Sequence, residues 1–522
     1  MVRLNVLGDT IRDVHKLLLN REKTVTKLCQ ESLNRIDQIE SLNPFITVCR
    51  SEAIKNASQL DQRISEVGPE DRENALYGIP ISIKDNFCTR NILTTCGSRM
   101  LHNYIPPYDA TVVSKLIKAN CIIMGKTNMD EFAMGSSSTT SFYGPTANYS
   151  KRELLKGQSL KDSLASNWFM AGGSSTGSAI SVSSGACFAS LGTDTGGSTR
   201  QPASLTGVVG FKPSYGLISR FGLVPLAHCL DVVSIIARCV DDVKLIFDAI
   251  AGQDEHDLTT VDHKTVLKSS LSLQNLASIP TIRIGIPDEF VNKGDMSSDV
   301  SKVYDETLSR ISSKDPSNNI RFELKKLSLP HSSLATECYT IISSAEIASN
   351  MSCYDGVKYG LSLKQSEDKE FNRDEFFRAN RDAGFGPEVK KRILLGNFFL
   401  LSGNREKYLD QALKVRRLIS DEFDKCFAMN EVDVILLPST PTTSVSYKDW
   451  LAKQDEDKLF REDYFLIPAN LANLPSISLP AGLSSKRLPL GLQLIANKYC
   501  DLDLLSVSKL FEAHVLKDVN QV

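Results

Sequence analysis

Short apolar strands alternate with amphipathic helices along most of this 522-residue chain, and this alternation most strongly limits its possible folds. In 76–87, isoleucine recurs at every second position from Ile79, which predicts a strand that runs out into Lys84. A helical pattern follows in 110–120 and a buried strand in 121–127. Helices that alternate with short apolar strands predict an α/β protein with a mixed or parallel sheet.

The same patterns assign further elements. The first 65 residues are predicted to be helical, with Thr24 or Thr26 capping an amphipathic helix that ends near residue 42. Further strands are predicted in 186–195, 204–214, 282–290, 432–440 and 490–494, and further helices in 175–185 and 503–515. The polar stretch 149–167 is expected to be a surface insertion, and 252–280 is expected to connect two lobes.

Charge and hydropathy exclude several classes of protein. The 60 basic and 62 acidic residues nearly balance, so no global field favours nucleic acid. No run of 18 apolar residues is present, so no membrane-spanning helix is predicted. The N-terminus lacks the apolar core of a secretory signal, and Asp9 and Asp13 make it a poor transit peptide, so the sequence by itself indicates the cytosol.

The metal-ligating residue types are scattered. None of the twelve cysteines is paired as C-x2-C or C-x4-C, and the seven histidines form no tight cluster. We therefore expect free, buried thiols in a reducing compartment and no metal site in this chain.

Two glycine- and serine-rich segments need an explanation, "AGGSSTGSA" at 171–179 and "GTDTGGSTRQP" at 192–202. By composition they could be linkers, but predicted strands and helices flank them closely. A phosphate-binding loop needs a lysine that neither segment supplies, and no G-x-G-x-x-G follows a strand. The remaining interpretation is a nucleophile site.

A serine nucleophile needs a base, and the nearest histidine, His228, lies thirty residues beyond Ser198. This distance weakens a Ser-His-Asp triad without excluding it. A lysine serves as the base when burial lowers its pKa enough to leave it neutral. Lys84, directly after an apolar strand, is the candidate, and the alternative is a lysine that reaches solvent from a strand end.

Motifs along nearly the whole chain resemble the amidase signature family. They are "YGIPISIKDNF" at 77–87, "GKTNMDEFAMGS" at 125–136, the two serine-rich segments, "YDGVKYG" at 354–360, "VKKRILLGNFFL" at 389–400 and "DYFLIPANLANLPSISLPAGL" at 463–483. The combination is similar to the branch of glutamyl-tRNA(Gln) amidotransferase A subunits, in the version found in eukaryotic organelles. This resemblance implies the amidase signature fold, a central mixed β-sheet flanked on both faces by α-helices.

The resemblance also implies a Ser-Ser-Lys triad. Ser198 would be the acyl-ester nucleophile, and Ser174, after a cis peptide bond, would relay protons between Ser198 and neutral Lys84. The backbone N–H groups of Thr195, Gly196 and Gly197 would stabilise the oxyanion.

Charged residues around these motifs complete the expected site. We expect Asp194 and Arg200 to form a pair that clamps the nucleophile loop. The resemblance places binding groups for the α-carboxylate and α-ammonium of glutamine at Arg392 and Asp463, with Tyr339 as a further pocket residue.

Two residues depart from the family pattern. Thr176 stands where glycine is usual and is expected to cap the following helix. Asn473 also stands where glycine is common.

The resemblance implies one amidase domain over 1–522, divided into N-terminal helices (1–65), a signature core (66–250), an inserted lobe (280–390) and a return to the core (391–522).

The resemblance also implies a glutaminase subunit that supplies ammonia to a B subunit, within a heterotrimer completed by a C subunit. Glutamine would bind this chain, and Glu-tRNA(Gln) mainly the B subunit, with no membrane contact. This chain would hold no cofactor, and ATP and Mg²⁺ would bind the B subunit.

The expected compartment is the mitochondrial matrix, with the cytosol as second choice. Two alternative functions stay open. One is a stand-alone amidase for another small or fatty amide, and the other is a non-catalytic scaffold subunit.

Overall fold

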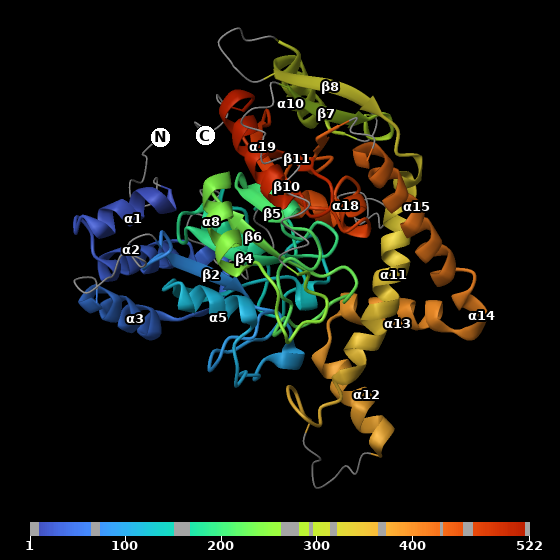
Figure 1. The fold of residues 1–522 in the computed structure, drawn as a ribbon. Coiled ribbons are helices and arrows are strands. Elements are labelled where there is room, and N and C mark those ends of the chain that lie inside the picture. Colours follow the sequence, from blue (N-terminus) through green and yellow to red (C-terminus); the bar gives the residue numbers. More distant parts are fainter. Residues whose placement is uncertain are drawn as a thin grey trace.

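One mixed sheet runs through the molecule and carries the eleven strands of its described part (Figure 1). The computed structural model describes residues 10–63, 74–150, 168–262, 281–291, 296–313, 321–363, 372–428, 432–452 and 463–516. The predicted insertion lies outside these ranges except for residues 149 and 150, as does the predicted connection beyond residue 262. The strands are β1 (Phe45–Val48), β2 (Pro80–Lys84), β3 (Ile122–Thr127), β4 (Ala189–Asp194), β5 (Val209–Lys212), β6 (Val232–Ala237), β7 (Thr281–Pro287), β8 (Arg321–Leu327), β9 (Val434–Pro438), β10 (Ser476–Leu483) and β11 (Pro489–Ile495).

The strand order is β1-β3-β2-β4-β6-β5-β10-β11-β9-β7-β8. β2 pairs in parallel with β3 and β4, β7 pairs in parallel with β8 and β9, and the other pairs are antiparallel. The predicted mixed α/β sheet is therefore confirmed. Because β2 and β4 are parallel neighbours, their carboxyl ends meet at one edge of the sheet. Lys84 and the loop after Asp194 thus come together there.

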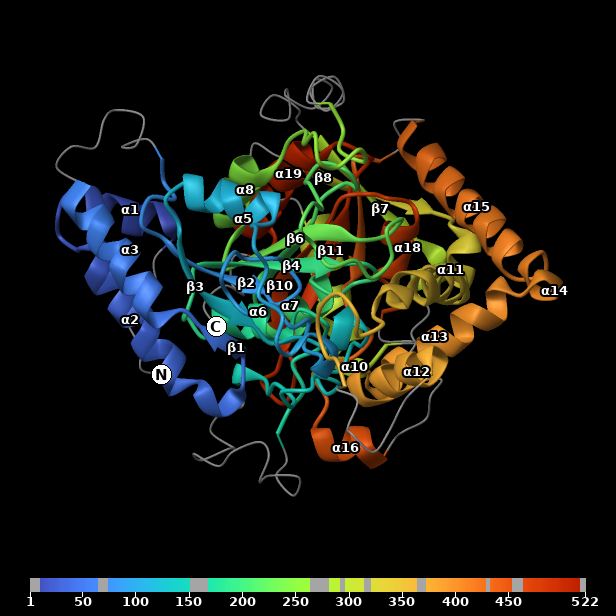
Figure 2. The ribbon, with the colours of Figure 1, turned by 90° about the horizontal axis from the view of Figure 1, so that it is seen from below.

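Helices cover both faces of the sheet. Figure 2 shows α5, α8 and α19 on one side of the central strands and α6 and α7 on the other, while α11, α13 and α15 pack together at one end. The α-helices are α1 (Ile11–Leu19), α2 (Val25–Gln38), α3 (Arg50–Arg63), α5 (Thr111–Lys118), α6 (Thr176–Ser183), α7 (Arg200–Thr206), α8 (Val240–Ile250), α10 (Ser298–Ser312), α11 (Ala335–Asn350), α12 (Arg373–Gly384), α13 (Pro387–Leu400), α14 (Ser402–Arg405), α15 (Leu409–Ala428), α16 (Tyr447–Ala452), α18 (Ile467–Leu471) and α19 (Asp501–His514).

The structure confirms some local predictions and corrects others. Thr24 caps α2 by accepting a hydrogen bond from the N–H of Lys27. The prediction that the first 65 residues are all helical is wrong, since "FITV" forms β1 at the sheet edge. Three β-branched residues, Ile46, Thr47 and Val48, favour a strand there. Strand β8 was not predicted, and with β7 it extends the same sheet.

No helix in the described ranges is long and apolar enough to cross a membrane. All twelve cysteines lie in described ranges and none of them forms a disulfide, and nine of them are buried. Burial raises the pKa of such thiols, to about 12 for Cys29 and Cys187, so they pack as apolar groups.

Candidate active site

The amine of Lys84 lies at the centre of the candidate site, at the carboxyl end of β2 and with no exposed surface. Its Nζ is 2.7 Å from Ser174 Oγ, 2.9 Å from Ser175 Oγ and 2.8 Å from Thr193 Oγ1. Burial lowers the pKa of Lys84 to about 7, although the buried Asp130, Asp194 and Asp231 carboxylates favour the charged form. A neutral amine satisfies three hydroxyl partners by donating two hydrogens and accepting one in its lone pair.

Two hydrogen bonds, each donated by a backbone N–H, join the two serine-rich segments. The N–H of Ser175 donates to the carbonyl of Ser198 over 2.9 Å, and the N–H of Gly173 donates to Gln201 Oε1 over 2.8 Å. The peptide bond between Gly173 and Ser174 is cis, as the family resemblance implies. The segments predicted to carry the relay and the nucleophile therefore lie side by side at the carboxyl ends of β2 and β4.

Ser198 sits in the turn between β4 and α7 and is partly exposed. Its hydroxyl donates to no acceptor among the described residues, so it is free to meet a substrate. Its role as nucleophile, like the roles of Ser174 and Lys84, stays a prediction.

The predicted oxyanion donors differ in availability. The N–H of Gly197 donates to Asp194 Oδ1 over 2.9 Å, so in this conformation it does not offer its hydrogen to a substrate. The N–H groups of Thr195 and Gly196 have no acceptor within the described ranges. Gly197 instead holds the loop in shape, because its φ of 134° is rare for residues with a side chain.

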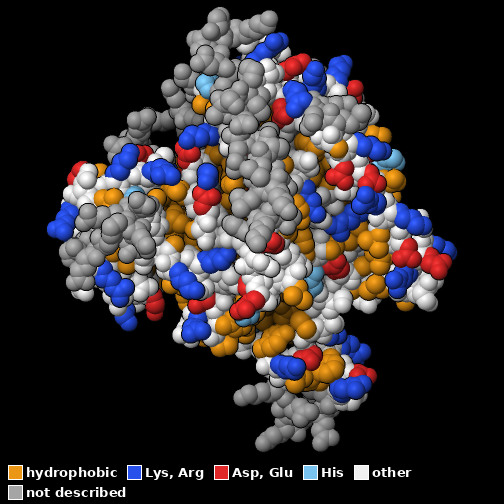
Figure 3. Space-filling view, in the orientation of Figure 1, with side chains coloured by type: hydrophobic (Ala, Val, Ile, Leu, Met, Phe, Trp, Pro, Cys, Tyr) orange, Lys and Arg blue, Asp and Glu red, His pale blue; other side chains and the backbone are white. Residues whose placement is uncertain are grey.

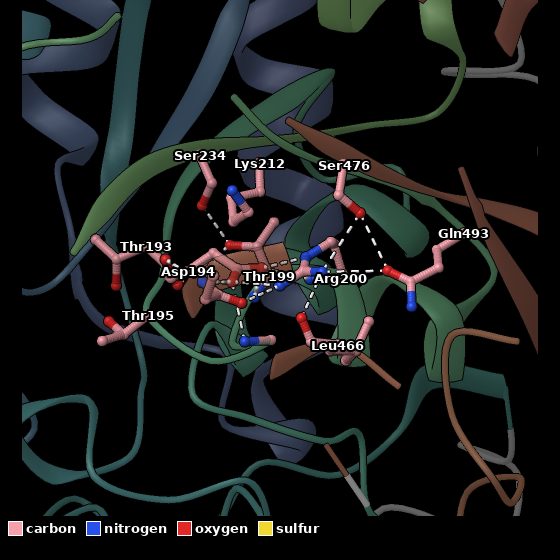
Figure 4. A network of polar contacts seen from close by, with 12 residues as sticks. Thr193, Asp194, Thr195, Thr199, Arg200, Lys212, Ser234, Leu466, Ser476 and Gln493 are labelled. Carbon is pink, nitrogen blue, oxygen red and sulfur yellow. Dashed lines mark hydrogen bonds and ion pairs between the residues drawn. The ribbon is translucent and has the colours of Figure 1, made fainter. Parts of the chain in front are cut away.

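Arg200 and Asp194 form the predicted pair, with no exposed surface on either side chain (Figure 4). Arg200 Nε and Nη2 each donate to one carboxylate oxygen of Asp194 over 2.9 Å. Burial alone would raise the pKa of Asp194, but the guanidinium outweighs this and holds it well below its usual range. Arg200 also donates to the Leu466 carbonyl, Ser476 Oγ, Gln493 Oε1 and Asn470 Oδ1. The pair therefore fastens the nucleophile loop to β10, β11 and α18.

We predict that Asp194→Asn lowers the free energy of unfolding by about 3–5 kcal/mol, because it leaves the buried Arg200 charge without its partner. Urea denaturation of the full chain measures this. The matched control is Asp248→Asn, which breaks a half-exposed pair with Lys244 and should change stability by less than about 1 kcal/mol. Equal effects of the two substitutions would contradict the clamp.

A cluster of polar side chains lies next to the two glycines of the nucleophile loop. A Cβ at Gly196 would approach the Tyr339 ring to 2.8 Å, and a Cβ at Gly197 would lie 3.1 Å from Asp463 Oδ1. Burial raises the pKa of Asp463 to about 7, and the nearby Arg392 opposes this rise. The same guanidinium acts on Tyr339, whose pKa burial raises well above its usual value. The structure thus brings together the three predicted binding residues, from α11, α13 and the turn before α18.

Two buried atoms of this cluster have no hydrogen-bond partner among the described residues, Arg392 Nε and Asp463 Oδ1. Unsatisfied buried polar groups are costly, so such atoms are expected where a ligand completes their hydrogen bonds. One is a donor and the other is an acceptor. Together they suit a small zwitterion that presents a carboxylate to Arg392 and an ammonium to Asp463.

Several residues that hydrogen-bond the predicted site residues were not predicted from the sequence. Ser175 and Thr193 share the Lys84 amine, Gln201 holds the Gly173 amide, and Asn470 and Gln493 hold Arg200. Gln493 lies in the predicted core strand at 490–494, which is β11. Ser175, Thr193 and Gln201 are adjacent to or near predicted site residues in sequence, which is the only signal the chain gives for them.

The predicted capping role of Thr176 is wrong. Its Oγ1 donates to the carbonyl of Gly172 over 2.5 Å, and Ser175, not Thr176, precedes α6. A hydroxyl inside the first helical turn reaches back to the preceding loop more easily than to the helix N–H groups ahead. Asn473 is the second residue that stands where the family usually has glycine. Its φ of 59° lies in the left-handed region, which favours glycine and which asparagine tolerates.

This arrangement, a buried amine among serine hydroxyls, is the one that the family resemblance implies for an amidase. The comparisons agree: the amidase family profile matches residues 27–505. The A subunits of mitochondrial glutamyl-tRNA(Gln) amidotransferase from Bos taurus and Homo sapiens are each 42% identical to the chain over 99% of its length and 96% of theirs.

A solved structure of a bacterial A subunit has the same fold as this chain. The crystal structure of the glutamyl-tRNA(Gln) amidotransferase A subunit from Thermotoga maritima superposes with a TM-score of 0.74 at 34% identity, covering 98% of this chain and 96% of that one. The chain belongs to the amidase family and, within it, to the glutamyl-tRNA(Gln) amidotransferase A subunits.

Proposed function

We propose that this chain is the glutaminase subunit of a tRNA-dependent amidotransferase, which hydrolyses glutamine and supplies ammonia to convert Glu-tRNA(Gln) to Gln-tRNA(Gln). The observation that carries the proposal is the 2.7 Å contact between the buried Lys84 amine and the Ser174 hydroxyl. The pKa of about 7 leaves much of this amine neutral near neutral pH, as a general base must be.

The first half of the reaction forms an ester. Ser198 Oγ attacks the side-chain carbonyl carbon of glutamine, its proton passes to Ser174, and the Ser174 proton passes to Lys84 Nζ. The charge that develops on the carbonyl oxygen is stabilised by the N–H groups of Thr195 and Gly196. The C–N bond then breaks, and Lys84 returns its proton through Ser174 to the leaving nitrogen, so ammonia leaves neutral.

The second half hydrolyses the glutamyl ester. Water attacks the ester carbon and gives up a proton to Lys84 through the same relay. The C–O bond to Ser198 breaks, Ser198 regains its proton, and glutamate is released. Each half returns Lys84 to the neutral amine, so one base serves both steps.

The chemistry of this cluster supports glutamine as the substrate. Arg392 Nε and Asp463 Oδ1 have no hydrogen-bond partner among the described residues, and Asp463 lies beside Gly197 of the nucleophile loop. The two groups suit the α-carboxylate and α-ammonium. A neutral fatty amide, one of the two substrate classes of the alternative stand-alone amidase, would leave both of these groups unsatisfied. The two groups therefore disfavour the fatty-amide version of that alternative.

The names of the relatives extend the proposal to partners and location. They are A subunits of an amidotransferase, and the mammalian ones are mitochondrial. We propose that this chain works with B and C subunits in the mitochondrial matrix. ATP, Mg²⁺ and Glu-tRNA(Gln) would then be bound by the B subunit.

The test is to co-express the chain with the B and C subunits of its own organism and to measure ammonia release and Gln-tRNA(Gln) formation. We expect both to depend on glutamine, with asparagine a much poorer donor. Hydrolysis of other amides by the chain alone, with no effect of the B and C subunits, would contradict the proposal.

Within the same assay, Arg392→Gln removes the guanidinium expected to hold the α-carboxylate. We expect KM for glutamine to rise about 10- to 100-fold, with a smaller fall in kcat, because the lost contact is remote from the scissile bond. The control is Arg373→Gln, an exposed arginine on α12 that pairs with Asp374, which should leave KM unchanged.

A further inference from the structure

The outer surface of α13 and α15 carries an unusual number of exposed apolar side chains. Leu394 is 72% exposed, Leu401 59% and Phe398 45%. These three are spaced by four and three residues, which places them on one face of the α13 helix and its end. Together with exposed residues of α15 and the connecting turn, they form what we call the α13–α15 face: Leu394, Phe398, Leu400, Leu401, Tyr408, Leu413 and Leu418.

The two helices of the α13–α15 face are joined at the turn between them. The rings of Phe398 and Tyr408 lie 5.6 Å apart, and Asn404 Nδ2 donates to the Phe398 carbonyl, so the turn is fixed against α13. On the inner side, a Cβ at Gly396 would lie 1.9 Å from the Ser344 carbonyl oxygen, so α13 is packed closely on α11. A firmly held apolar surface of this kind marks an interaction site.

The charges beside the face select the chemistry of the partner. Between residues 387 and 418 the exposed charged residues are five basic ones, Lys391, Arg405, Lys407, Lys414 and Arg417, and one acidic one, Glu406. Arg405 and Arg417 also pair with the less exposed Asp410 and Asp421, so the basic excess is smaller than this count. Lys414 is one helical turn from Leu418, and Arg417 is one turn from Leu413, so basic and apolar groups are neighbours. Figure 3 shows apolar side chains gathered where α11, α13 and α15 lie, with Lys and Arg and some Asp and Glu at the border.

We infer that the α13–α15 face docks a partner subunit of the amidotransferase through an amphipathic segment with an apolar centre and acidic flanks. The inference rests on the proposed function, which supplies the partner. Apolar groups at the centre favour a protein, because a nucleic acid offers mainly phosphates to a surface. The basic border complements acidic flanks and would add a salt-dependent attraction.

The test compares Leu394→Glu and Leu418→Glu with Leu258→Glu in full-length chains. Leu258 is 98% exposed in a loop outside the face and is the matched control. Each variant is mixed with purified B and C subunits of the same organism, and Kd is measured. We expect Kd to rise about 100-fold for the two face variants and to stay unchanged for Leu258→Glu. Glutaminase activity of the isolated chain should be the same in all three.

The outcomes separate the docking inference from the proposed function. If the wild-type chain binds neither subunit, the proposed function fails. If it binds and both face variants bind equally well, the docking inference alone fails. Loss of tRNA binding with intact subunit binding would assign the face to RNA, and conversion of a wild-type homodimer to a monomer would assign it to a second copy of this chain. Either result would overturn the inference.

Discussion

Ser198→Ala is expected to reduce glutamine hydrolysis by about 10⁴-fold or more, because removing the nucleophile of a serine hydrolase removes the covalent pathway. The same variant should not harm the fold. The Ser198 hydroxyl has no hydrogen bond to lose among the described residues, and its carbonyl still accepts from the Ser175 N–H. Ammonia release and thermal denaturation of purified wild-type and variant chains measure the two effects separately.

The control for this prediction is Ser183→Ala, at the end of α6, where the hydroxyl has one long contact of 3.4 Å to the Ile180 carbonyl. We expect it to keep full activity. Unchanged ammonia release from Ser198→Ala would refute the nucleophile assignment and favour the non-catalytic scaffold. Ammonia added directly should restore Gln-tRNA(Gln) formation in the complex with Ser198→Ala, because only the glutaminase step is lost.

Patterns in the sequence were enough to place the site on the sheet. Alternating isoleucines located β2, and an apolar run located β4, so the positions of Lys84 and Ser198 at strand ends followed from periodicity alone. Parallel pairing of β2 and β4 then brought the two ends together. The Asp194–Arg200 pair was also predictable, since opposite charges six residues apart flank one turn.

Other parts of the site depend on contacts that no local pattern encodes. Asn470 and Gln493 reach Arg200 from more than 260 residues away, and their sequence contexts are those of a short helix and a core strand. Tyr339, Arg392 and Asp463 came only from the family resemblance. The orientation of the Gly197 N–H was missed for a different reason, because it depends on which nearby acceptor the loop turns toward, and Asp194 is already there.

Three lysines of the described ranges, Lys84, Lys126 and Lys212, are fully buried. Their hydrogen-bond partners show which of them can act as a base. Lys126 lies 3.5 Å from the Asp85 carboxylate and donates to the Phe87 carbonyl. Lys212 donates to the carbonyls of Pro213 and Leu474, which can only accept. Lys84 alone has three hydroxyl partners, which can also donate to it. Only Lys84 is therefore placed to exchange a proton with a serine.

This difference predicts the pH dependence of the reaction. Because burial lowers the pKa of Lys84 to about 7, its neutral, active form increases as the pH rises through 7. We expect kcat at saturating glutamine, where the bound α-ammonium keeps Asp463 ionised, to rise with pH through a midpoint near 7 and to level off above about pH 8, with about one-tenth of the plateau value at pH 6. A flat profile between pH 6 and 8 would contradict neutral Lys84 as the base.

Lys84→Met, which keeps the length of the side chain but removes the amine, should lower kcat by about 10³-fold or more and abolish the midpoint near pH 7. The matched control is Lys212→Met, because burial lowers the pKa of Lys212 to about 7 as well. That substitution takes the donor from two carbonyls and is expected to destabilise the fold, yet it should leave the pH midpoint in place. If Lys212→Met moved the midpoint while Lys84→Met kept it, the base would have to be assigned to Lys212.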